Sequence, residues 1–165
     1  MENMMHYKSF EVWKHVLKDL TIEKIEIQAT KYNQAYESFD FNYKNRNIVN
    51  RLAKKTPNKK GYFVTVWKKD GDNNNIPLDT IDIQDLLVIN IIDEKKIGQF
   101  IFNQAILIEK RILNNTNQKG KMAFRIYPPW EKELNQSAKK TQAWQSEYFL
   151  DLTAPTTQSF INKFF

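Results

Sequence analysis

The stretch Asp85-Leu-Leu-Val-Ile-Asn-Ile-Ile92 is apolar at every position except its first residue and Asn90. A strand that is exposed on one face alternates between apolar and polar residues, whereas a continuous apolar run is typical of a strand covered on both faces. The run is also far too short to span a bilayer. We therefore expect it to form a central strand of a sheet that has other elements packed on both sides.

Strand patterns lie before and after this run. Phe39, Phe41 and Tyr43 alternate with polar residues, which is typical of a half-buried strand. Pro57 ends the next pattern, because proline cannot donate to a strand ladder. The segment that follows Gly61 has the highest β-propensity of the chain. Strands are therefore expected at 39–43, 48–55, 61–69, 98–102 and 122–127.

Helix patterns occupy both ends of the chain. Four apolar residues from Phe10 to Leu20 recur at spacings of 3, 4 and 3, which predicts an amphipathic helix. A second stripe with helical spacing leads to Leu152, with Asn135 or Ser137 as a suitable N-cap. Helices are expected at about 8–20, 103–113 and 137–152.

The order of these elements is helix, several strands, helix, strand, helix. A chain of 165 residues is long enough to bury a sizeable core and suits one domain. We predict an α/β (α+β) fold in which a mixed central β-sheet is flanked by helices, in a single domain over residues 1–165.

The composition excludes several classes of site. There is no cysteine, so disulfides and cysteine-based zinc sites are impossible. His6 and His15, the two histidines, both lie near the N-terminus, which disfavours a histidine-based metal site or a Ser/His triad. The N-terminus lacks the order of charged and apolar residues that a signal peptide has. We expect a cytoplasmic protein without a cofactor or a bound metal.

Charge is strongly segregated along the middle of the chain. Residues 44–69 carry nine basic residues and no acid, and residues 70–94 carry seven acids and no base. The basic residues are Lys44, Arg46, Arg51, Lys54, Lys55, Lys59, Lys60, Lys68 and Lys69, and the acids are Asp70, Asp72, Asp79, Asp82, Asp85, Asp93 and Glu94.

The basic segment has two interpretations. Lysines bind phosphate backbones as point charges, and an interleaved Tyr62 could stack on an unpaired base. Alternatively, strand aromatics fill the core and lysines solvate the edge of a sheet. Which aromatic faces inward depends on the register of the strand. The candidate phosphate contacts are Lys54, Lys55, Lys59, Lys60 and Lys68.

A second cluster of candidate contacts follows in the last third of the chain. Arginine offers a forked donor to phosphate, and glutamine offers both a donor and an acceptor. The same residues could equally be ordinary surface positions. The candidates are Arg125, Lys139 and Gln142 for polar contacts, and Tyr127 and Trp130 for stacking on bases.

The acidic segment admits a metal site or a solvated loop. Asp79, Asp82 and Asp85 recur at every third residue before the buried strand, and carboxylates at the edge of a strand can hold Mg²⁺. Acidic runs are usually solvated, and we predict no metal site here.

Five motifs in this order resemble the MepB-like proteins of bacteria: RLAKKTPNKKGYFVTVWKK, IDIQDLLVI, IGQFIF, GKMAFRIYPPWE and KKTQAWQSEYF. The resemblance covers about residues 39–152. It implies a restriction-endonuclease-like core that binds nucleic acid. The family is encoded in some bacteria beside multidrug-efflux genes, which implies a link to the antimicrobial response.

The resemblance also implies a degenerate catalytic site. Nucleases of that superfamily hold Mg²⁺ with an aspartate on one central strand and a second carboxylate on the next, followed two residues later by a lysine. On this sequence Asp85, Gln99 and Ile101 would take these places. Neither glutamine nor isoleucine replaces the charged group, so we expect catalysis to be lost.

We therefore expect a protein that is not an enzyme and that binds nucleic acid, with single-stranded RNA or DNA preferred over duplex. One alternative is a Mg²⁺-dependent nuclease with a rearranged site built on Asp82, Asp85 and Gln99. Another is an adaptor or regulator whose basic strands bind an acidic protein partner.

Overall fold

Six strands form the main sheet, in the order β1-β2-β3-β8-β9-β11. The computed structural model describes residues 6–18 and 25–165. β3 and β8 run parallel, and every other neighbouring pair in this sheet is antiparallel. The predicted mixed sheet is confirmed. Its strands are β1 Gln28–Ala29, β2 Phe39–Tyr43, β3 Arg46–Leu52, β8 Leu86–Asp93, β9 Lys96–Asn103 and β11 Phe149–Asp151.

Strand β8 lies near the middle of this sheet and is buried along most of its length, as its apolar run predicts. Successive side chains of a strand point to opposite faces. Leu87, Ile89 and Ile91 accordingly enter one hydrophobic cluster, while Leu86 and Val88 enter another. Both faces of β8 are therefore covered.

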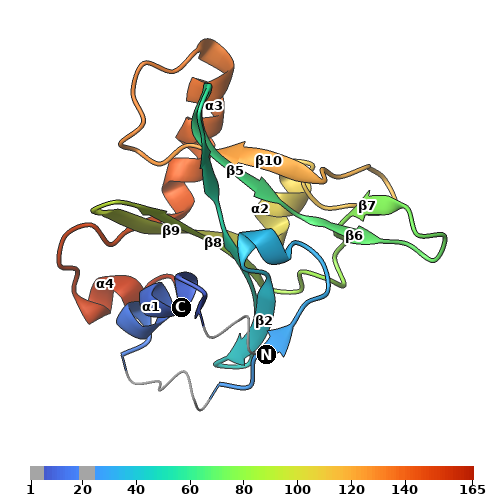
Figure 1. Cartoon of the computed structure of the whole chain (residues 1–165), viewed down its shortest axis with the longest axis horizontal. Coiled ribbons are helices and arrows are strands. Elements are labelled where there is room, and N and C mark those ends of the chain that lie inside the picture. Colours follow the sequence, from blue (N-terminus) through green and yellow to red (C-terminus); the bar gives the residue numbers. More distant parts are fainter. Residues whose placement is uncertain (1–5, 19–24) are drawn as a thin grey trace.

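Different elements cover the two faces (Figure 1). Helices α1 Ser9–Val16 and α4 Gln158–Asn162 pack on one face, where Trp13 and Ile161 belong to one apolar cluster. A second sheet and helix α2 Gln104–Glu109 pack on the other. The helix predicted over 8–20 is present over a shorter range, and residues 19–20 of that prediction lie outside the described residues.

The second sheet has the order β10-β5-β4, and a separate hairpin pairs β6 with β7. The strand predicted over 61–69 is divided at Val66, where the chain leaves β5 and enters β6. Tyr62, Val64 and Val66 are buried, which decides the question left open by the sequence of which aromatic faces inward. The bounds are β4 Lys54–Thr56, β5 Lys59–Thr65, β6 Trp67–Lys69, β7 Asn75–Pro77 and β10 Ala123–Ile126.

The helix predicted over 137–152 is wrong in its last third. Helix α3 spans Gln136–Gln145, a 3-10 turn follows over Ser146–Tyr148, and the chain then pairs with β9 as β11. The Asn135 side chain caps α3 by accepting a hydrogen bond from the Ala138 amide, as expected. Helix α2 is also shorter than the predicted range of 103–113.

Three buried amide side chains connect adjacent strands at the centre of the main sheet. Asn90 Nδ2 on β8 donates to Asn50 Oδ1 on β3 at 2.7 Å and to the Arg51 carbonyl at 2.8 Å. Gln99 Nε2 on β9 donates to Asn90 Oδ1 at 2.9 Å. Trp13 Nε1 of α1 donates to the same Asn50 oxygen at 2.7 Å, so this network also ties a helix to the sheet.

Replacing the middle amide should destabilise the whole domain. Asn90→Ala leaves the Arg51 carbonyl and the Gln99 amide without their partners inside the sheet. Each lost buried hydrogen bond costs about 1 kcal/mol or more, so we expect a loss of about 3 kcal/mol. Urea unfolding monitored by tryptophan fluorescence measures it. Asn58→Ala, at an exposed turn, is the control and should change stability by less than about 0.5 kcal/mol; an equal effect of both substitutions would contradict the role of the network.

Candidate functional site

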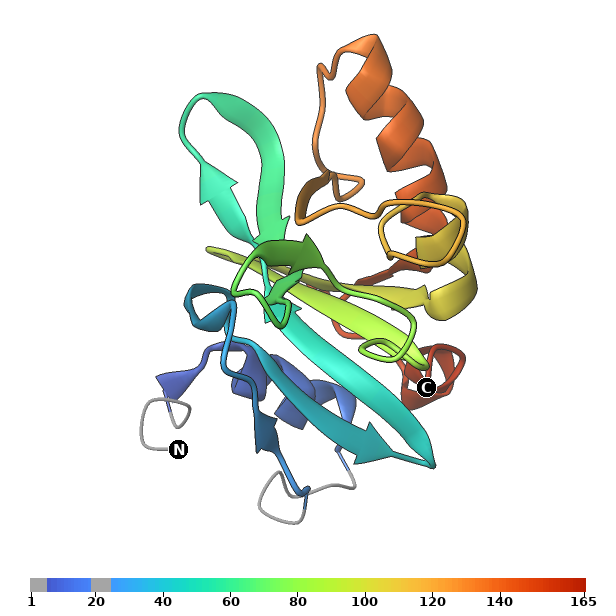
Figure 2. The same ribbon diagram turned by 90° about the vertical axis from the view of Figure 1, so that its right-hand side faces the viewer.

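The β4–β5 hairpin projects from the domain on the same side as α3, and the 127–135 segment runs between them (Figure 2). Four of the predicted phosphate contacts lie on this hairpin and are exposed. The lysine pairs flank the turn at Pro57, as the sequence predicts. These residues are Lys54, Lys55, Lys59 and Lys60.

Gly61 lets the hairpin lie close to β10. Its φ of +80° belongs to the left-handed region, which a side chain disfavours. A Cβ atom at this position would lie 2.6 Å from Cδ1 of Tyr127 and 2.8 Å from the Ile126 carbonyl oxygen. Both the backbone conformation and the space therefore require glycine.

Arg125 on β10 binds the main chain of the hairpin. Its Nη2 donates to the Lys60 carbonyl at 2.9 Å, to the Lys59 carbonyl at 3.3 Å and to the Thr56 hydroxyl. Its Nε also donates to the Lys60 carbonyl, at 3.2 Å. Arg125, predicted as a phosphate contact, thus uses these donors to hold the tip of the hairpin.

A groove of about 570 Å³ lies between the hairpin and the 130–132 segment. We call it the basic groove. Five lysines line it against two acids, Asp93 and Glu131. A smaller hollow of about 470 Å³ on the other side of the hairpin contains Tyr127 and Arg125. The five lysines are Lys55, Lys59, Lys60, Lys96 and Lys132.

The floor of the basic groove is a hydrogen-bonded group. The Tyr62 hydroxyl donates to Asp93 Oδ2 at 2.6 Å, and Trp130 Nε1 donates to the Tyr62 oxygen at 3.2 Å. Lys55 pairs with the same carboxylate oxygen at 3.1 Å. The hydrogen bond from Tyr62, with the Lys55 contact, lowers the pKa of Asp93 despite partial burial.

The predicted stacking residues differ in their exposure. Tyr62 is only 1% exposed, so its ring offers no face to a base, and the predicted stacking role is corrected. Trp130 is half-buried in the wall of the basic groove, with Lys96 Nζ 5.8 Å from its ring centroid. Tyr127 is half-buried beside the smaller hollow.

Lys68 lies elsewhere, on β6. Its Nζ forms ion pairs with Asp79 and Asp82, both at 2.7 Å. Partial burial alone would lower the pKa of Lys68, but the hydrogen bonds to the two carboxylates outweigh it and raise the pKa. Two acids therefore neutralise this cation. Lys68 is also absent from the lining of the basic groove, so the structure does not bring it together with the hairpin lysines.

The glutamines of α3 support the groove from behind. Gln142 Nε2 donates to the Pro128 and Glu131 carbonyls at 3.0 and 3.1 Å, which fixes the segment that carries Trp130. Buried Gln145 accepts from the Tyr127 amide and donates to the Arg125 carbonyl. Lys139 is exposed on the same helix.

The predicted degenerate site does not come together. Gln99 pairs with Asn90 across the β8–β9 ladder, and Ile101 pairs with Val88. Asp85 precedes β8 and accepts from the Asn47 amide at 2.8 Å. It is five residues from the level of Gln99, which corresponds to roughly 17 Å along a strand. Gln99 is also fully buried.

A cavity of about 580 Å³ lies between the β2–β3 face of the main sheet and β6. We call it the Asp40 cavity, after a carboxylate that the sequence analysis missed. Asp40 alternates with the core residues Phe39 and Phe41, so it points to the opposite face of β2. That alternation was the available signal. Arg51 of β3 and Asp82 also line the cavity.

Asp40 has an unusual titration behaviour. Burial raises its pKa to about 6; the charge of Arg51 opposes this shift, and Asp82 adds to it. Its Oδ1 atom is enclosed and has no hydrogen-bond partner among the described residues.

Within the part of the chain that the structure describes, no group of three His, Cys, Asp or Glu side chains is arranged to hold a metal ion. No described helix has the length and apolar character needed to cross a membrane.

Comparisons with known proteins agree on one relationship. A family model described as MepB-like matches residues 30–151. The chain is similar to the crystal structure of MepB, with 43% sequence identity and a TM-score of 0.80. That similarity covers 90% of this chain and 99% of the MepB chain. No curated protein matches the sequence.

The hairpin should loosen when Gly61 gains a side chain. Gly61→Ala places a Cβ against Tyr127 and forces alanine to a positive φ, which together should cost about 2 kcal/mol. We expect faster hydrogen exchange in β4 and β5 and a lower urea midpoint. Gly71→Ala is the matched control, because nothing lies within 4 Å of a Cβ there. Unchanged exchange in Gly61→Ala would contradict this account of the hairpin.

Removing the Asp40 charge should stabilise the domain in a pH-dependent manner. The pKa is higher in the folded than in the unfolded state, so stability is lost as pH rises through about 6. Asp40→Asn removes this cost, and we expect it to raise the free energy of unfolding by about 2 kcal/mol at pH 7.5 but by little at pH 4. Urea unfolding at both pH values measures the difference. An equal effect at both would contradict the titration.

Proposed function

The chain belongs to the MepB-like family, and we propose that it binds single-stranded nucleic acid through the basic groove. The observation that carries this proposal is the concentration of lysines around that groove. Five lysines face two acids, and one of these acids, Asp93, is already paired with Lys55 and Tyr62. A polyanion that follows the groove would release its condensed counterions, which is the main source of such binding.

The architecture of the groove suits a nucleic-acid strand better than a compact anion. The hairpin lysines are exposed on long flexible side chains, while Arg125 and Gly61 hold the main chain beneath them. This combination suits several successive phosphates better than one fixed group. Lys54 precedes Lys55 on β4 and points to the other face of the strand, with its Nζ 4.8 Å from the ring centroid of Tyr36, so it does not line the basic groove.

A preference for single strands follows from the aromatic side chains. Bases of a single strand can expose a ring face to a side chain such as Trp130, whereas bases in a duplex stack on each other. Trp130 lies in the wall of the groove beside the lysines. Tyr127 is the second candidate, on the other side of the hairpin.

The proposal extends to binding without cleavage on a restriction-endonuclease-like core. That core, the link to efflux genes and the cytoplasmic location all come from the resemblance or from composition. The rearranged Mg²⁺ site on Asp82, Asp85 and Gln99 is poorly supported, because Gln99 is enclosed in the sheet and Asp82 is paired with Lys68. An adaptor function would use the same basic groove for an acidic protein.

Salt dependence of binding tests the proposal. We expect fluorescence anisotropy with labelled single-stranded RNA and DNA to give a slope of log K against log salt near −3 to −4, as for about four to six neutralised phosphates. A variant with Lys55, Lys59, Lys60 and Lys132 changed to Gln should reduce the slope by about 3, at about 0.7 for each charge. Duplex DNA should bind more weakly.

The matched control changes four exposed lysines outside the hairpin, Lys8, Lys14, Lys44 and Lys163, to Gln. It removes the same net charge and should leave most of the binding intact. Equal losses of binding in both variants would mean that binding depends on net charge alone and not on the basic groove. Denaturing gels with and without Mg²⁺ test for cleavage, and loss of cleavage in Asp85→Asn would favour the nuclease. Binding of an acidic protein that an unrelated nucleic acid cannot displace would favour the adaptor.

A further inference from the structure

The Asp40 cavity contains a buried cation that is not neutralised. Arg51 is only 2% exposed, and it makes no ion pair among the described residues. Its Nε donates to the Thr65 carbonyl at 3.1 Å and its Nη1 to the Asn50 carbonyl at 2.8 Å. Its Nη2 makes no hydrogen bond to the part of the chain that the structure describes. Burial lowers the pKa of Arg51 to about 10.

An unpaired buried charge is costly. Desolvation of a guanidinium costs several kcal/mol unless an anion compensates it. Asp40 interacts electrostatically with Arg51, but the two form no ion pair among the described residues. Asp82 already binds Lys68. Because Arg51 lines an open cavity, an anion from solution can supply the missing partner.

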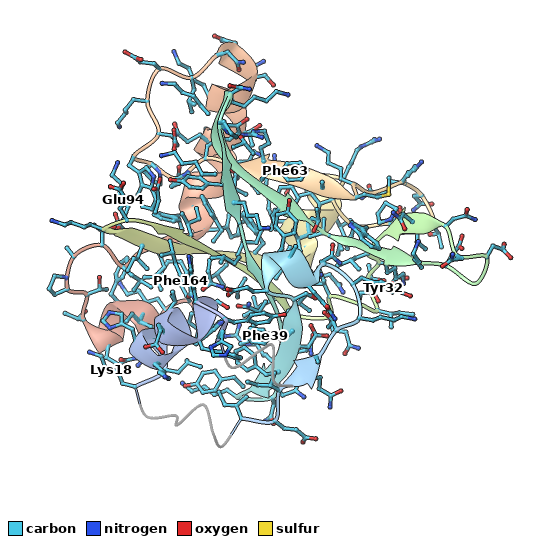
Figure 3. The ribbon with its side chains drawn as sticks, in the orientation of Figure 1. Lys18, Tyr32, Phe39, Phe63, Glu94 and Phe164 are labelled. Atoms are coloured by element: carbon cyan, nitrogen blue, oxygen red, sulfur yellow. The ribbon has the colours of Figure 1, made fainter. Side chains whose placement is uncertain are left out.

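The lining of the cavity also carries a pair of aromatic rings. Tyr32 lies beside the β6–β7 hairpin (Figure 3), with its ring centroid 5.4 Å from that of Trp67. Asn33 fixes this wall, since its side chain donates to the Trp67 carbonyl at 2.7 Å and accepts from the Trp67 amide at 3.4 Å. Both aromatic residues are half-buried and line the cavity.

We propose that the Asp40 cavity binds a nucleoside phosphate, with the phosphate group on Arg51 and the planar base beside Tyr32 and Trp67. A cavity of about 580 Å³ has the size of small-molecule sites in proteins. An arginine is the side chain best suited to bind a phosphate with its forked donors. The proposal does not depend on the basic groove, which lies at the β4–β5 hairpin.

The same cavity is poorly suited to a divalent cation. Two carboxylates, Asp40 and Asp82, line it, but one of them is paired with Lys68. Lys69 adds positive charge beside Arg51, whereas Asp79 and Asp82 neutralise Lys68. A cation would therefore meet repulsion from Arg51 and Lys69, and both of these groups attract an anion.

Asp40 makes the binding dependent on pH. The charged groups around it are Arg51, Asp82, Lys68 and Lys69. Ionised Asp40 competes with an incoming anion for Arg51, while its protonated form can donate a hydrogen bond to a phosphate oxygen. Binding therefore tightens as pH falls through about 6, the pKa to which burial raises Asp40.

Isothermal titration calorimetry with the full chain tests the proposal. AMP and UMP represent free nucleotides, and a short oligonucleotide with a 5′-phosphate represents the end of a strand; its unphosphorylated form is the control. Sulfate serves as a probe that keeps its charge from pH 5.5 to 7.5. We expect sulfate to bind about fivefold tighter at the lower pH, and Asp40→Asn to bind it about fivefold tighter than wild type at pH 7.5.

Arg51→Lys keeps the positive charge but loses the forked donor, and we expect it to weaken nucleotide binding at least about tenfold. Circular dichroism verifies its fold, and Asp40→Asn provides an independent test if that fold is lost. The variant in which Lys55, Lys59, Lys60 and Lys132 are changed to Gln should bind AMP as wild type does, which separates this site from the basic groove.

Three results would overturn the proposal. The first is no binding of nucleotides or sulfate by wild type and Asp40→Asn at millimolar concentrations. The second is equal affinity in folded Arg51→Lys. The third is binding of Mg²⁺ or Mn²⁺ that Asp40→Asn abolishes, which would make the cavity a cation site. In the variant that lacks Lys55, Lys59, Lys60 and Lys132, a 5′-phosphorylated oligonucleotide that binds tighter than both AMP and its unphosphorylated form would assign the site to strand ends. Tighter binding of AMP would assign it to free nucleotides.

Discussion

Burial of β8 on both faces is the constraint on which the rest of the structure depends. A strand without a solvent face needs a complete layer of other elements on each side, and in this chain the two layers consist of different kinds of element. Helices α1 and α4 supply one layer, and the second sheet with α2 supplies the other. The amide network through Asn90 crosses the middle strands at this point, so a wrong register would leave buried polar groups without partners.

The second layer explains why the basic groove exists. The chain leaves the main sheet after Leu52, forms the β4–β5 hairpin and crosses back through β6. Only the part of β5 that follows Gly61 is needed to cover β8, and Tyr62 and Val64 are buried there. The tip with Lys59 and Lys60 extends past the core and is held by Arg125. The covering layer and the proposed binding surface are thus two ends of the same strands.

The sequence predicts much of the fold because its strongest patterns are local. The apolar run of β8 and the alternation in β2 need no knowledge of tertiary contacts. β11 was missed because Trp144 and Tyr148 follow helical spacing while both pack on Phe102, and pairing with β9 then overrides the local preference. The degenerate site was misplaced because only the antiparallel register reveals how far Asp85 is from Gln99. The Asp40 cavity joins residues from five segments, namely β2, β3, β6 and the segments before β2 and before β8, which no spacing rule connects.

The contacts that hold the hairpin have a consequence for its evolution. Arg125 binds the carbonyl oxygens of Lys59 and Lys60, and Gln142 and Gln145 also bind main-chain atoms. Carbonyl groups are the same whichever side chain the residue carries. Substitutions at the hairpin tip can therefore change the charge of the groove while the scaffold keeps its shape. If the groove binds nucleic acid as proposed, relatives of this protein can diverge in what they bind along this surface without refolding it.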